Sequence, residues 1–196
     1  MVLYFDAVKD PSHLHGALDY ISTPEYWQKI NIEEESYAPL TLFRHGRAEA
    51  AYRILFDLSK PGKLRREYPE VSYSVIAALV GGAMGVSPSL NDGERFDLQT
   101  LAQLPRSDDE AFLQSLPMRG RIIDVKHTGT FSSSLSNRSG PAVRWRAAFQ
   151  GTVRQLKVDG KPVLAEHATL PGGMSVSWIT TIVNPGVTVV VNRLDK

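Results

Sequence analysis

From Arg119 to the end of the chain, apolar and polar positions alternate in the way that is typical of β-strands. Around Trp145, apolar side chains occupy every second position. We predict strands over residues 120–131, 142–158, 162–169, 174–183 and 186–193. Asp159-Gly160 and Asn184-Pro185-Gly186 are turn signals between them. Residues 132–140 are rich in serine and glycine, and we predict a flexible loop there.

The first half of the chain has a mixed pattern. Residues 50–58 alternate between apolar and polar side chains, which predicts a strand. Apolar residues between 71 and 84 recur every three or four positions, which predicts a helix. Residues 107–110 form a capping box before an apolar run, so we predict a second helix up to residue 116. Thr23-Pro24 predicts the start of a short helix.

The order of these elements predicts an α+β protein in which helices and strands are segregated along the chain. Residues 1–40 are otherwise irregular and are interpreted as an N-terminal arm. Residues 41–196 are expected to form one globular α+β domain, with an antiparallel sheet and two or three helices. The length of 196 residues is sufficient for a hydrophobic core without additional cross-links.

The composition excludes some classes of site. The chain has no cysteine, which rules out disulfides, thiolate metal sites and a cysteine nucleophile. Its apolar runs are shorter than the roughly 20 residues of a membrane-spanning helix. The first residues have neither a basic lead nor a long apolar stretch, so we do not expect a secretory signal. Any membrane contact is therefore expected to be peripheral.

The charges are grouped in blocks of alternating sign. Residues 1–40 and 67–117 are acidic, residues 41–66 and 118–161 are basic, and residues 162–196 are balanced. The net charge of +1 conceals this pattern. Such blocks favour a protein that binds an acidic surface with one region and its own copies with another.

Two basic clusters are the candidate binding residues. The first occupies a predicted turn and consists of Lys60, Lys63, Arg65 and Arg66. The second consists of Arg119, Arg121, Arg144, Arg146 and Arg154, of which the last three have even spacing on one predicted strand. Such a surface could bind an anionic membrane or a phosphate backbone, or could simply be solvated.

Arg44-His45-Gly46, interpreted as the end of a strand, resembles the phosphohistidine motif of the histidine phosphatases. In that family the histidine accepts the phosphoryl group and the arginine holds phosphate oxygens. The family also needs a second arginine, a second histidine and an acid. Arg95, His127 or His167, and Glu166 are the later candidates, and none has a matching context. An ordinary histidine in a basic segment is the alternative.

Residues 50–158 resemble the rhabdovirus matrix proteins in the order of their elements. The resemblance includes the predicted strand at 52–58, the basic turn, the helix at 71–84 and the segment from Trp145 to Val153. Tyr37 and Leu40 have the Tyr-x-x-Leu spacing of a late-domain motif.

This resemblance implies a non-enzymatic viral structural protein of matrix type. Such a protein would self-associate, and it would link the nucleocapsid to an anionic membrane during assembly and budding. Its partners would be further copies of itself, the viral nucleoprotein, the membrane surface and, indirectly, RNA. Its expected location is the virion, the host cytoplasm and the inner face of the membrane. No catalytic residue, metal or cofactor is expected.

Three other functions remain open. Another virion coat or capsid subunit would share the self-association but not the lipid binding. A histidine-phosphatase-like enzyme would use Arg44 and His45. A bacterial effector or binding module is the remaining possibility.

Overall fold

The computed structural model describes residues 3–63, 68–89, 95–170 and 172–194. It has α+β architecture, which confirms the predicted fold class. The chain divides into two compact units. The helical unit consists of residues 1–83 together with 170–174, and the β unit consists of residues 84–169 and 175–196.

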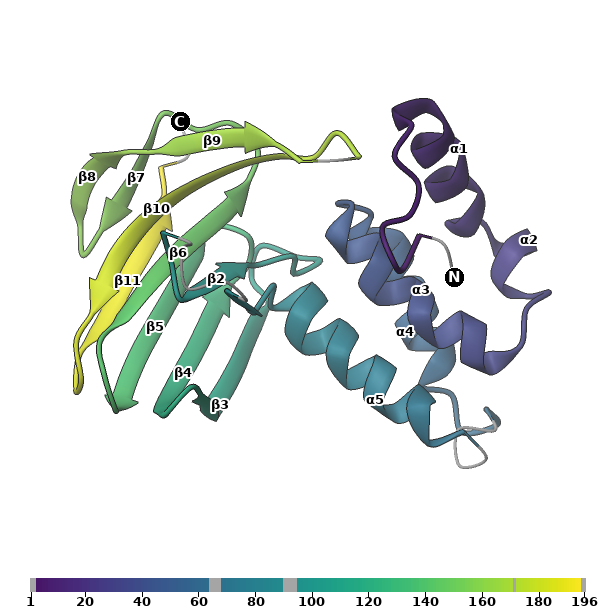
Figure 1. Ribbon diagram of the computed structural model, residues 1–196, viewed down its shortest axis with the longest axis horizontal. Helices are drawn as coiled ribbons and strands as arrows, with labels where there is room; N and C mark the ends of the chain where they lie inside the picture. Colours follow the sequence, from purple (N-terminus) through teal and green to yellow (C-terminus); the bar gives the residue numbers. More distant parts are fainter. Residues whose placement is uncertain (1–2, 64–67, 90–94, 171, 195–196) are drawn as a thin grey trace. The chain divides into compact units, whose positions relative to one another are not determined.

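The helical unit is built around one central helix. Its elements are α1 (Pro11–Ile21), α2 (Pro24–Trp27), α3 (Ile32–Arg44), α4 (Ala48–Leu58), α5 (Pro69–Ala77) and the π-helix η2 (Ala78–Ala83). Helix α3 contacts α4 and α5 (Figure 1), and it also contacts η2. Asp10 caps α1 by accepting hydrogen bonds from the Ser12 and His13 amides, and Asn31 caps α3.

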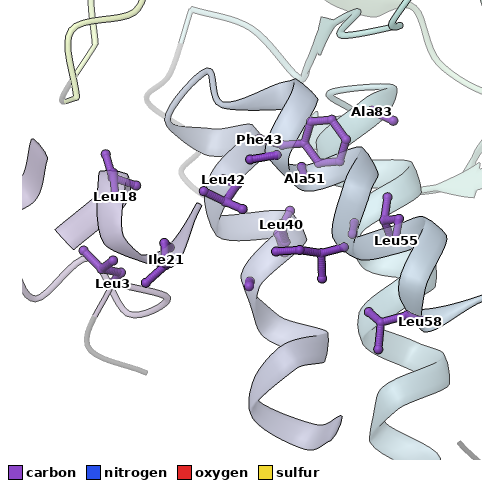
Figure 2. Packing of buried hydrophobic residues seen from close by; sticks show 14 of the residues in the cluster. Leu3, Leu18, Ile21, Leu40, Leu42, Phe43, Ala51, Leu55, Leu58 and Ala83 are labelled. Atoms are coloured by element: carbon purple, nitrogen blue, oxygen red, sulfur yellow. The ribbon is translucent and has the colours of Figure 1, made fainter. Parts of the chain in front are cut away.

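Aliphatic side chains and one aromatic ring form the core of this unit (Figure 2). Leu18, Leu42 and Phe43 are fully buried. Burial of such a side chain contributes about 1.5–3 kcal/mol. Gly82 allows η2 to approach closely, since a Cβ atom there would collide with the Phe43 ring. The close fit of α3 and η2 therefore depends on a glycine.

Two sequence predictions for this unit were wrong. Residues 1–40, predicted to be a largely irregular arm, contain α1, α2 and most of α3, and the predicted boundary at residue 40 falls inside α3. Residues 50–58, predicted as a strand, belong to α4. Its buried residues, which include Ala51, Ile54 and Leu58, have helical spacing. The alternation was misleading because Phe56, one of its apolar positions, is not buried: its side chain is 77% exposed.

The β unit contains two sheets. The first has the strand order β1 (Ser87–Pro88), β2 (Leu98–Leu101), β6 (Val143–Gln150), β10 (Ser175–Val183) and β9 (Glu166–Thr169). The second has the order β3 (Glu110–Met118), β4 (Arg121–Thr128), β5 (Ser132–Ser139), β11 (Thr188–Arg193), β7 (Gln155–Val158) and β8 (Lys161–Leu164). Among the described residues, the strand pairings are antiparallel except for that of β2 with β6. Strand β5 contacts β6 and β10 of the other sheet.

Most of the predicted strands are confirmed. The ranges 120–131, 174–183 and 186–193 correspond to β4, β10 and β11. The range 142–158 is divided into β6 and β7, and 162–169 into β8 and β9. The Asp159-Gly160 hairpin is also confirmed, since Val158 pairs with Lys161 and both turn residues have positive φ.

Two segments of the β unit differ from the prediction. The expected flexible loop at 132–140 is largely strand β5, which pairs with β4 and β11. The expected helix at 107–116 is a turn followed by strand β3. Strand β3 pairs antiparallel with β4, and this pairing overrides the local capping signal.

Candidate functional site

The helical unit contains a cavity of about 510 Å³. Its lining combines apolar side chains with four ionisable ones. The apolar part comprises Leu3, Val8, Pro11, Leu14, Leu170 and Gly172. The ionisable part comprises Asp6, Lys9, Arg44 and His45. We call this cavity the Asp6–His45 pocket.

Three segments that are distant in sequence position these side chains. Helix α3 ends at Arg44, and His45 is its C-cap with φ −105°. The N-terminal turn places Asp6 through a hydrogen bond from its amide to the Leu3 carbonyl, at 3.1 Å. The connection between β9 and β10 contributes Leu170 and Gly172.

His45 lies at the centre of the polar part of the pocket. Its side chain is only 8% exposed, and its Nε2 atom is 3.9 Å from Oδ1 of Asp6. Gly172 has φ +93°, and a Cβ atom there would lie 2.8 Å from Nδ1 of His45. The wall beside the imidazole is therefore bare backbone, which no other residue type could form without displacing the ring.

The two cations of the pocket have no carboxylate partner among the described residues. The Arg44 guanidinium lies 5.7 Å from the centroid of the Tyr4 ring, and its Nη1 atom donates a long hydrogen bond of 3.4 Å to the Tyr4 carbonyl. Lys9 is exposed. Because Arg44 occupies the last turn of α3, the negative end of the helix dipole favours its charge.

The structural context of Arg44-His45-Gly46 differs from the one assumed. The motif ends a helix, not a strand. The further residues that a phosphatase would need, Arg95, His127, Glu166 and His167, belong to the β unit. His127 is fully buried. The motif nevertheless forms part of a pocket, together with Asp6.

The basic turn is largely neutralised. Lys63 pairs with Glu35 at 2.8 Å and with Asp57, and Lys60 pairs with Asp57 at 2.6 Å. Burial raises the pKa of Asp57, but hydrogen bonds from Lys60 and Lys63 outweigh it and lower that pKa to about 2. Burial also raises the pKa of Glu35, which is 2% exposed. Arg65 and Arg66 lie outside the described residues.

The second basic cluster is divided by its local partners. Arg144 and Arg121 both pair with Asp97, at 2.8 and 3.4 Å. Burial tends to raise the pKa of Asp97, but the hydrogen bonds from Arg144 lower it. The Arg146 guanidinium lies between two aromatic rings, 4.0 Å from the Phe96 centroid and 5.0 Å from that of Trp178.

The remaining members of that cluster are exposed and separate from strand β6. Arg119 occupies the turn between β3 and β4 with φ +46°. Arg154 lies beyond the end of β6, so it does not continue the face formed by Arg144 and Arg146. Within the described part of the chain, no ion pair involves Arg119 or Arg154.

Tyr37 and Leu40 lie in helix α3, and the Leu40 side chain is 7% exposed. A partner that binds Tyr-x-x-Leu as an extended peptide would have to unfold this helix.

No helix in the described ranges is long and apolar enough to span a membrane.

Sequence reasoning missed a buried polar cluster in the β unit. His127 hydrogen-bonds with Ser133 Oγ at 2.8 Å and with the Met84 carbonyl at 3.0 Å. Burial lowers the pKa of His127 to about 4. A signal was present, since Ile123, Val125 and His127 alternate on one strand face. The cluster is closed to solvent, so we interpret it as structural.

His13 and His15 are both exposed on α1. Within the part of the chain that the structure describes, no group of three His, Cys, Asp or Glu residues could hold a metal ion. The Asp6–His45 pocket is therefore identified as a candidate site by its geometry.

In comparisons with known proteins, the chain matches no protein family and no curated protein sequence.

Proposed function

We propose that this protein binds a small molecule in the Asp6–His45 pocket. The observation that carries the proposal is the convergence of Asp6, Lys9, Arg44 and His45 on one cavity of about 510 Å³. Small-molecule sites of roughly 300–1,000 Å³ typically combine apolar walls with a few placed polar groups.

The backbone around the pocket supports this proposal. Gly46 has φ +73°, and a Cβ atom there would lie 2.8 Å from Sδ of Met174. Gly172 is restricted in the same way by His45. Residues 46 and 172 thus allow the end of α3 and the segment 170–174 to pack closely, which pre-organises the side chains that would contact a ligand.

The test follows the imidazole of His45 by NMR, with the signal assigned from the His45→Gln variant. The probes are glucose, glucose 6-phosphate, glucuronate, citrate, AMP and leucine, each titrated to millimolar concentration. We expect at least one probe to shift the His45 signal in a saturable way. Val8→Trp, which fills the pocket, should abolish the shift, whereas Glu25→Trp, on the surface of α2, should not. If no probe saturates the signal, the proposal is wrong.

The matrix-type function stays a prediction. Ion pairs at Lys60, Lys63, Arg121 and Arg144 reduce the charge that those side chains can offer to an anionic surface. For this reason we place small-molecule binding first. Cosedimentation with anionic and neutral liposomes across a salt series tests the membrane role separately. Salt-sensitive binding to anionic liposomes alone would favour it, and the absence of binding would count against it.

A further inference from the structure

The two cations of the Asp6–His45 pocket differ from most other described cations of the helical unit. Arg47, Arg53, Lys60 and Lys63 each pair with a carboxylate elsewhere in that unit. Lys9 and Arg44 form no such pair among the described residues, and both line the same cavity. Two uncompensated cations that face one cavity create a local positive potential.

Asp6 does not cancel this potential. It contributes one carboxylate to the described lining, against the two cations Lys9 and Arg44. The Asp6 carboxylate is directed toward His45, from which it is 3.9 Å distant. Asp6, Lys9 and Arg44 together therefore give the lining a net charge of +1.

We infer that the ligand of this pocket carries a carboxylate or phosphoryl group that binds to Arg44 and Lys9. This inference rests on the proposed function. Both anions have oxygen pairs that match the planar fork of an arginine, and a lysine adds a compact second charge. The long hydrogen bond to the Tyr4 carbonyl engages one of the five Arg44 N–H groups, which leaves donors for a ligand.

The other lining residues indicate the chemistry of the rest of the ligand. Leu3, Val8 and Leu14 offer apolar contact. The Asp6 carboxylate accepts hydrogen bonds and repels a second anionic group, so a neutral hydroxyl or amine of the ligand suits the position beside His45. The predicted ligand thus has one anionic end and a body that is neutral or apolar.

The experiment compares three molecules with the same pyranose ring: glucose, glucuronate and glucose 6-phosphate. Dissociation constants are measured from the His45 NMR signal at constant ionic strength. We expect one or both of the anionic molecules to bind at least about tenfold more tightly than glucose. The comparison of glucuronate with glucose 6-phosphate shows whether a carboxylate or a phosphoryl group is preferred.

Variants with matched changes in net charge separate local recognition from general attraction. Arg44→Gln should weaken binding of the preferred anion by about tenfold or more, whereas Arg53→Gln should change it less than about twofold. Lys9→Gln provides a second variant at an exposed side chain, with Lys29→Gln as its control. Asp6→Asn should strengthen anion binding, because it removes a repulsive charge.

The outcomes distinguish this inference from the proposed function. Equal binding of glucose and its anionic analogues, or equal effects of Arg44→Gln and Arg53→Gln, would overturn the inference but leave the pocket as a binding site. The inference would also fail if glucose, which has no anionic group, were the one probe that saturated the His45 signal. If none of the six probes binds, both proposals fail.

Discussion

Acid should destabilise the β unit through one residue, His127. The Met84 carbonyl can only accept a hydrogen bond, so Nε2 of His127 carries the proton and Ser133 donates to Nδ1. The imidazole is neutral in the folded protein at neutral pH, because burial disfavours its charged form. Burial lowers its pKa from 6.5 to about 4. In the unfolded chain the same group is protonated below about pH 6.5.

The sign and size of the effect follow from this difference. Between pH 6.5 and 4 the unfolded state binds the proton and the folded state does not, so stability falls as the pH falls. A difference of about 2.5 pKa units, at 1.36 kcal/mol for each, gives a loss of about 3 kcal/mol by pH 4. Most of this loss, about 2 kcal/mol, occurs above pH 5.

Urea unfolding from about pH 7.5 to 4 measures this loss. Fluorescence is a suitable probe, since Trp145 is buried in the same unit. The non-titrating variant His127→Gln is less stable at neutral pH, but its stability should change less with pH. Subtracting its free energy of unfolding from that of the wild type removes the effects of the carboxylates. If this difference does not shrink by roughly 3 kcal/mol on acidification, the reasoning is refuted.

Two further predictions use matched variants. Lys63→Ala should lower the free energy of unfolding by about 3 kcal/mol, because it leaves the carboxylate of buried Glu35 without its cation, whereas Lys60→Ala should cost less than about 1 kcal/mol. Gly85→Ala should destabilise the β unit far more than Gly160→Ala in thermal unfolding. Both glycines have positive φ, but a Cβ at residue 85 would collide with the backbone of Leu101, whereas residue 160 faces open space.

The sequence was most informative where one face of a strand is buried. In β6, the apolar positions that alternate around Trp145 share one face, and Trp145 and Phe149 on that face are both buried. The same reasoning failed for β5, in which Ser133 and Asn137 are buried and hydrogen-bonded across the unit. Serine and asparagine are poor strand formers in isolation, so only the neighbouring strands stabilise this conformation.

The candidate site was predictable only in part. Arg44-His45 stood out as a motif, but the sequence placed it on a strand and gave no indication of a partner. Asp6, His45 and Gly172 are far apart along the chain. The pattern of apolar residues does not indicate that these three residues lie close together in the folded protein. Of the predicted basic residues, Lys60, Arg119, Arg144 and Arg154 are exposed, whereas the Arg121 side chain is only 13% exposed. Their ion pairs depend on the folded chain, as the contacts of Asp97 with Arg121 and Arg144 show.

The helical unit combines two segments that are far apart in the sequence, and this has a consequence for synthesis on the ribosome. Residues 1–83 emerge first, but residues 170–174 belong to the same compact unit. At roughly 5–20 residues per second, several seconds separate the two segments. The nascent helices must wait through the synthesis of most of the β unit before Leu170 and Gly172 complete the pocket wall. A nascent chain that has not yet reached Leu170 and Gly172 therefore lacks one wall of this pocket.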